Sequence, residues 1–201
     1  MRNRGMRRQT KTRERVLAAA ARILRGEGYS RLTMERIAAE SGVAKTTLYR
    51  RWPTKAAVCM ELYLDVAGRE LQVPDTGDVA ADLKQIANAV VHLQTRTVAG
   101  PAFLGLIAEA LVNPDTRADF LAEFAERRRE VTRTVLKRAI QRGEIRADTD
   151  VDLVIDALGG AVTFRLLQGH APLSTRFTDR LVALVLSGCA TDRALAKKRN
   201  R

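Results

Sequence analysis

A run of hydrogen-bond donors is the feature of this sequence best suited to chemistry. Between Gly42 and Lys55 the chain reads GVAKTTLYRRWPTK, and its polar groups include no carboxylate. Ammonium, guanidinium and hydroxyl groups donate hydrogen bonds, which suits binding to phosphates and to the acceptor edges of bases. The donors of this run that precede its tryptophan are Lys45, Thr46, Thr47, Tyr49, Arg50 and Arg51.

The net charge of +12 is concentrated at the two ends of the chain. Residues 1–55 hold 15 lysines and arginines against four glutamates, a net charge of +11, and residues 193–201 add +5. Residues 56–192 carry a net charge of −4. A basic segment of this density indicates a polyanionic partner, and nucleic acid is the usual one.

Catalytic motifs are absent from the sequence. It contains no CxxC, HExxH, GxSxG or P-loop pattern, and its two histidines, His92 and His170, are far apart. Cys59 and Cys189 are the only cysteines, and neither has neighbours with metal-ligand spacing. We therefore predict a protein that is not an enzyme and has no cofactor and no metal.

Size and hydropathy place the chain among globular proteins. It has 201 residues, 46% of them apolar, and apolar runs such as Leu181–Leu186 are far shorter than the roughly 20 residues that span a bilayer. Together with the sparse cysteines, this predicts a cytoplasmic protein.

The elements that must position the donors are predicted to be helices, because apolar residues recur at a period of 3.6 nearly throughout. Thr33 is a predicted N-cap, Gly42 a turn, and Pro53 a stop signal. Asn113 and Pro114 predict the start of one unbroken helix of about 40 Å. The nine predicted helices cover residues 12–27, 33–40, 44–51, 54–71, 79–98, 101–112, 113–142, 148–168 and 174–188.

The first three helices match a helix-turn-helix, with Val43, Leu48 and Trp52 directed inward. Residues 12–58, and GVAKTTLYRRWPTK above all, resemble the DNA-binding domain of the TetR family of bacterial transcriptional regulators. The resemblance implies an all-α, nine-helix architecture. Its expected parts are a basic arm (1–11), a helix-turn-helix domain (12–56), an effector-binding and dimerisation domain (57–192) and a basic tail (193–201).

The resemblance also implies roles for single residues. Lys45, Thr46 and Thr47 match the start of the family's recognition helix, so they are expected to reach bases and nearby phosphates. The other expected DNA contacts are Thr33, Tyr49, Arg50, Arg51 and Lys55. For Arg50, the equal alternative is a solvated surface charge. Ala44 stands where many members have a capping serine. The arginines at 2, 4, 7 and 8 either enter the minor groove or are disordered.

Two apolar faces on each of the last two predicted helices indicate a homodimer that they form together. The residues assigned to this interface are Leu153, Ala157, Gly160, Phe164, Leu181, Leu184 and Val185. The alternative is that both helices are simply central to a monomer. Two recognition helices about 34 Å apart would read a palindrome in duplex DNA.

The resemblance further implies a pocket for a small-molecule effector within helices 79–98, 101–112 and 113–142. Its candidate lining residues are Asn88, His92, Phe103, Glu109, Phe120 and Phe124. The predicted function is a repressor that binds a palindromic operator as a homodimer and is released by the effector. The alternatives are a DNA-binding regulator without an effector and a non-specific nucleic-acid-binding architectural protein, which would show only a steep salt dependence.

Overall fold

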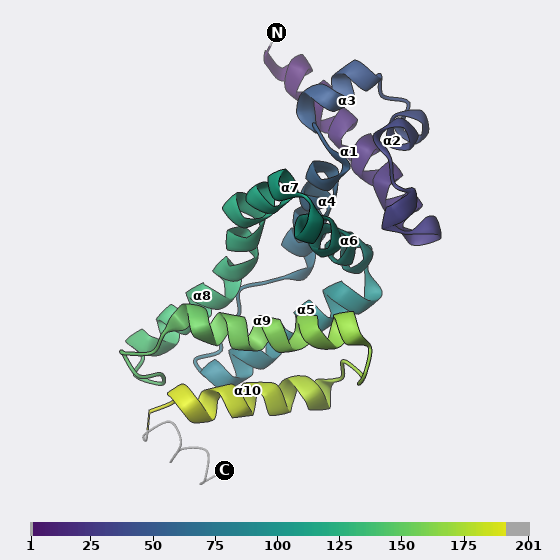
Figure 1. The fold of residues 1–201 in the computed structure, drawn as a ribbon. Coiled ribbons are helices and arrows are strands. Elements are labelled where there is room, and N and C mark those ends of the chain that lie inside the picture. The colour runs from purple at the N-terminus through teal and green to yellow at the C-terminus, as the bar shows by residue number, and fades with distance from the viewer. Residues whose placement is uncertain (1, 192–201) are drawn as a thin grey trace. The chain divides into compact units, whose positions relative to one another are not determined.

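The computed structural model describes residues 2–191, with the side chains of all but residues 2–6, 8 and 123. Within this range the only β-type pairing is one bridge between Ile145 and Ala190, so the all-α prediction is confirmed (Figure 1). Two short segments are a 3₁₀ turn, η1 (Tyr29–Arg31), and a π-helix, η2 (Phe120–Ala125). The α-helices are α1 (Arg2–Glu27), α2 (Met34–Ser41), α3 (Lys45–Arg51), α4 (Lys55–Glu70), α5 (Val79–Arg96), α6 (Ala99–Val112), α7 (Pro114–Asp119), α8 (Glu126–Gln141), α9 (Val151–Gln168) and α10 (Thr175–Cys189).

Local signals define the short helices near the start of the chain. The Thr33 hydroxyl accepts a hydrogen bond from the Arg36 amide at 3.2 Å, which caps α2. Gly42, at φ 62°, takes the left-handed conformation that ends α2. Helix α3 ends at Arg51, two residues before Pro53. These bounds agree with the predicted ones to within one residue.

Helix α1 begins ten residues earlier than predicted, at Arg2 instead of Thr12. The apolar periodicity on which the prediction relied starts only at Val16, whereas arginine, methionine and glutamine are good helix formers without any apolar face. The side chains of residues 2, 4 and 8 lie outside the described part of the structure. Their approach to the minor groove therefore stays a prediction.

The unbroken helix predicted from Asn113 to Arg142 is wrong, because the π-helix η2 separates α7 from α8. No glycine or proline lies between Asp115 and Arg142, so the sequence carries no local signal for the change. Side-chain packing accounts for it. Within η2, the ring centroid of Phe124 lies 5.0 Å from that of Tyr63 on α4 and 5.0 Å from that of Phe120.

The chain forms two compact units, each built from two separate stretches. Unit 1 consists of residues 2–68 and 96–124, and unit 2 of residues 69–95 and 125–191. Unit 1 therefore adds α6 and α7 to the helix-turn-helix. The predicted boundary at residue 57 is a functional division and stays a prediction.

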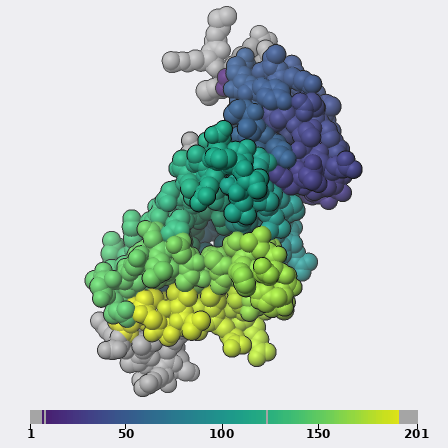
Figure 2. All heavy atoms as spheres, in the orientation of Figure 1, coloured from purple at the N-terminus to yellow at the C-terminus, as the bar shows by residue number. Residues whose placement is uncertain are grey.

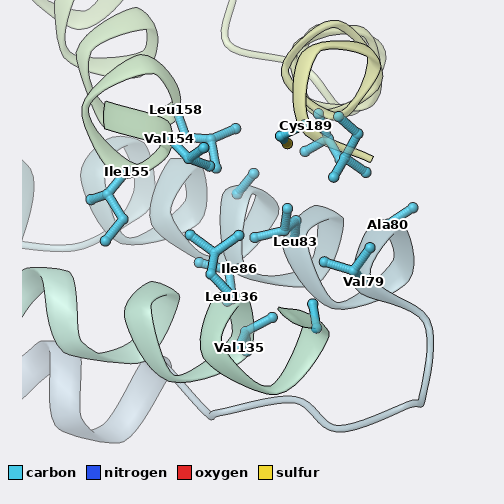
Figure 3. Packing of buried hydrophobic residues seen from close by; sticks show 14 of the residues in the cluster. Val79, Ala80, Leu83, Ile86, Val135, Leu136, Val154, Ile155, Leu158 and Cys189 are labelled. Carbon is cyan, nitrogen blue, oxygen red and sulfur yellow. The ribbon is translucent and has the colours of Figure 1, made fainter. Parts of the chain in front are cut away.

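The core of unit 2 is formed by α5, α8, α9 and α10 (Figure 3). Val79, Leu83 and Ile86 of α5 belong to the same buried cluster as Leu136 of α8 and Leu158 of α9. Burying each such side chain stabilises the fold by about 1.5–3 kcal/mol. Among the described residues, no single helix is both long and apolar enough to cross a membrane.

Candidate nucleic-acid interface

The inner side of the helix-turn-helix is apolar, as predicted. Val43, Leu48 and Trp52 are 8%, 0% and 2% exposed. The indole Nε1 of Trp52 donates a hydrogen bond to Glu61 Oε2 on α4 at 2.6 Å, so the end of α3 is tied to the next helix. This packing fixes which side of α3 remains available to a ligand.

The opposite side of α3 is a surface of donors, which we call the donor face. It consists of Lys45, Thr46, Tyr49, Arg50 and Arg51, all exposed, with Thr47 half-buried beside them. Ala44 stands at the N-cap without a side-chain hydrogen bond, as expected where a serine is missing. Positive charge and donors on a short exposed helix are what the major groove of DNA accepts.

Tyr49 of the donor face is held by a carboxylate on the neighbouring helix. Its hydroxyl donates to Glu35 Oε1 on α2 at 3.0 Å, and this hydrogen bond raises the pKa of Tyr49. The side chain is 42% exposed, so its ring remains accessible. In the free protein, the Tyr49 hydroxyl therefore already donates to Glu35, and an expected hydrogen bond to a DNA phosphate would have to replace this one.

Arg51 is held in the same way by Glu61. Its Nη2 lies 3.1 Å from Glu61 Oε1, and its guanidinium carbon lies 4.8 Å from the centroid of the Trp52 ring. Arg13 of α1 pairs with the same carboxylate and with Asp65. Glu61 thus joins α1, α3 and α4, a role that sequence reasoning missed because its partners are up to 48 residues away.

Lys55 lies at the first residue of α4, which begins at a Thr54 hydroxyl that accepts from the Ala57 amide at 3.1 Å. Its Nζ is 3.6 Å from Glu109 Oε2 of α6 and 4.4 Å from the centroid of the Tyr29 ring. A cation at a helix N-terminus favours anions, because the helix dipole adds to its charge. Lys55 is therefore placed for phosphate but already contacts a carboxylate.

The predicted effector residues are divided between the two units. In unit 1, Phe103 and Phe124 are buried in an aromatic cluster with Tyr63, and Phe120 contacts Phe124. Glu109, also in unit 1, accepts hydrogen bonds from Tyr29 and Thr116. The members in unit 2 are Asn88, which accepts from the Thr178 hydroxyl at 2.6 Å, and His92, which is exposed with Nε2 3.8 Å from Glu70. The effector pocket stays a prediction.

The predicted dimer residues divide into an exposed and an internal group. Leu153, Phe164 and Leu184 are 65%, 59% and 71% exposed, an unusual degree for large apolar side chains. Leu181 is buried in the core of unit 2 and Val185 packs against that core, so these two serve the interior of one copy. The remaining candidates, Ala157 and Gly160, are exposed and share one stripe of α9 with Leu153 and Phe164.

A basic helix-turn-helix with an exposed donor face defines a class of protein, the DNA-binding transcriptional regulators. Comparison with known proteins gives the family. Residues 16–62 match the family described as "Bacterial regulatory proteins, tetR family", and residues 73–185 match "Tetracyclin repressor-like, C-terminal domain". The chain belongs to the TetR family of bacterial transcriptional regulators.

Individual relatives agree with this assignment. The HTH-type transcriptional regulator YdeS of Bacillus subtilis is 32% identical over 92% of this chain and 93% of its own length. The DNA-binding transcriptional repressor TetR of Mycobacteroides abscessus is 33% identical over 85% of this chain and 90% of its own. The crystal structure of the TetR family transcription regulator SCO0332 is 38% identical, with a TM-score of 0.78, and covers 90% of this chain and 100% of that one. The protein is thus a transcriptional regulator and not an enzyme.

Proposed function

We propose that the protein is a repressor that binds a palindromic operator as a homodimer and leaves it when a small molecule binds. The observation that best supports sequence-specific DNA binding is the donor face, which has five exposed side chains on α3, three of them cationic and none acidic. A repressor role is supported by the relative from Mycobacteroides abscessus, which is named as one.

The dimer is supported by the exposed apolar residues of unit 2. Helices α9 and α10 lie side by side at the surface of that unit (Figure 2, green and yellow). The large apolar side chains that this copy leaves exposed are Leu153, Phe164 and Leu167 on α9 and Leu184 on α10. Leu184→Glu would place a charge among them, so we expect a monomer on size-exclusion chromatography. A dimer that persists in this variant contradicts the assignment of α10 to the interface.

DNA reading is tested by selecting bound duplexes from a random pool at physiological salt. We expect a palindromic consensus, preferred over random competitor by about a thousandfold or more. Tyr49→Ala should lower affinity for that consensus about tenfold, the order expected when one charged hydrogen bond is lost. Arg25→Ala is a control for the loss of an exposed side chain outside α3, since Arg25 lies in the last turn of α1.

The alternatives give different outcomes in the same assays. Selection without a consensus, combined with a steep salt dependence, would indicate a non-specific architectural protein. A consensus without any compound that raises the unfolding midpoint in a small-molecule screen would indicate a regulator without an effector. A compound that raises the midpoint and also releases the selected DNA supports the full proposal.

A further inference from the structure

Helix α6 contacts the helix-turn-helix at Tyr29, directly after α1. The Tyr29 ring lies so close to Gly105 of α6 that a Cβ on this glycine would fall 2.0 Å from Tyr29 Cγ. Only a residue without a side chain permits this approach. The contact therefore holds α6 against η1 within unit 1.

One turn further along α6, Glu109 faces the same place. Its Oε2 accepts a hydrogen bond from the Tyr29 hydroxyl at 2.8 Å and lies 3.6 Å from Lys55 Nζ. Its Oε1 accepts from the Thr116 hydroxyl at 3.3 Å. Burial raises the pKa of Tyr29, so its hydroxyl remains a donor across the physiological range. We call Tyr29, Lys55 and Glu109 the α6 cluster.

Resting on the proposed function, we propose that Glu109 is a positioning residue that competes with the DNA backbone for Lys55. In the free protein, the Glu109 carboxylate pairs with the Lys55 ammonium group at the start of α4, where a DNA phosphate is expected to bind. Operator binding must then exchange a carboxylate for a phosphate, or hold both around one ammonium group. The strength of this DNA contact depends on where α6 holds Glu109.

The competition predicts that Glu109→Gln strengthens operator binding. A carboxylate this close to the phosphate site weakens phosphate binding by Coulomb repulsion and by neutralising Lys55. Its removal is expected to raise affinity about fivefold, which corresponds to two unit charges about 4 Å apart in water. Freeing Lys55 also releases more counterions, so the salt dependence of affinity should steepen by about 0.9 for each half-site.

Tyr29→Phe separates competition from a merely structural role. Removal of the hydroxyl takes one donor from Glu109 Oε2, which leaves the carboxylate more strongly paired with Lys55. Competition therefore predicts weaker operator binding for Tyr29→Phe and stronger binding for Glu109→Gln. A structural role predicts no gain in affinity for Glu109→Gln, because the glutamine carbonyl still accepts from the Tyr29 hydroxyl, and a loss for Tyr29→Phe, which lacks that donor.

The experiment measures operator affinity against salt concentration for the full-length protein and both variants. Glu27→Gln is the control for net charge, because Glu27 is exposed and pairs with Arg36 of α2 instead of Lys55. In a Lys55→Ala background, the steepening caused by Glu109→Gln should disappear. Trp52 fluorescence verifies that unit 1 is folded in each variant.

The outcomes separate this inference from the function on which it rests. Opposite shifts for Glu109→Gln and Tyr29→Phe, with a slope change that needs Lys55, support it. Equal slopes for wild type, Glu109→Gln and Glu27→Gln on a selected operator overturn the inference and leave the regulator intact. A wild-type protein without operator preference overturns the proposed function itself.

Discussion

Gly105→Ala provides a direct steric test of the contact between α6 and η1. The new Cβ would lie 2.0 Å from Cγ, 2.1 Å from Cδ2 and 2.6 Å from Cβ of Tyr29. These atoms are close to the Tyr29 backbone, so a rotation about the end of the side chain cannot relieve the overlap and η1 must move. Overpacking of this kind costs about 1–3 kcal/mol.

A helix gains from the same substitution, because alanine is favoured over glycine by about 0.8–1 kcal/mol in a helix interior. The net loss of unfolding free energy for Gly105→Ala is therefore about 0–2 kcal/mol relative to wild type, and about 1–3 kcal/mol relative to a glycine-to-alanine change in a helix without the overlap. Gly68→Ala in α4 is the matched control, since nothing lies within 4 Å of its added Cβ. The control should be neutral or slightly stabilised.

The assay is urea unfolding followed by the fluorescence of Trp52. This residue is the only tryptophan of the chain and is buried in unit 1, so its emission reports on the unit that contains the substitution. We expect a lower urea midpoint for Gly105→Ala than for Gly68→Ala. A Gly105→Ala protein as stable as the Gly68→Ala control would refute the close approach of Tyr29.

Three further predictions concern capping and charge. Thr33→Ala removes the N-cap of α2 and should lower the stability of unit 1 by about 1 kcal/mol in the Trp52 assay; an unchanged midpoint contradicts the cap. Glu61→Gln weakens three hydrogen bonds to the Glu61 carboxylate and should lower the free energy of unfolding by on the order of 1–3 kcal/mol in the same assay. An unchanged midpoint would mean that α3 is held by packing alone. In the wild type, the hydrogen bond from Arg133 holds the pKa of the Asp152 carboxyl below 3.8. The ion pair therefore stabilises unit 2 above that pH, and its contribution is lost as the pH falls through the pKa of the folded state. Asp152→Asn removes this contribution. Circular dichroism should show the variant less stable than wild type at pH 7 and equal to it in strong acid; a pH-independent difference excludes the charge pair as the cause.

The sequence sufficed where structure depends on neighbouring residues. Thr33, Gly42 and Pro53 act on their own turns of the chain, and the bounds of α2 and α3 follow from them. The donor face follows as well, because burial of Leu48 at one side of a helix exposes the other. The family resemblance came from the same short stretch.

The sequence was insufficient where structure depends on distant residues. The π-helix η2 has no local signal and depends on packing between Phe124 and Tyr63, which are 61 positions apart. Likewise, the sequence gives no sign that the oxygens of Glu109 accept hydrogen bonds from Tyr29 and Thr116, and its place in an effector pocket stays a prediction. Amphipathic periodicity indicates that a residue faces inward but not which partner it meets.

The interleaving of the two units has a consequence for protein engineering. A fragment that stops at residue 68 contains the complete helix-turn-helix but leaves Tyr63 without the rings of Phe103 and Phe124. Tyr29 would likewise lose α6 as its support. A chimaera that exchanges operator preference between two family members would therefore have to transplant residues 96–124 along with the N-terminal segment, because that second stretch completes the hydrophobic interior beneath the grafted helices.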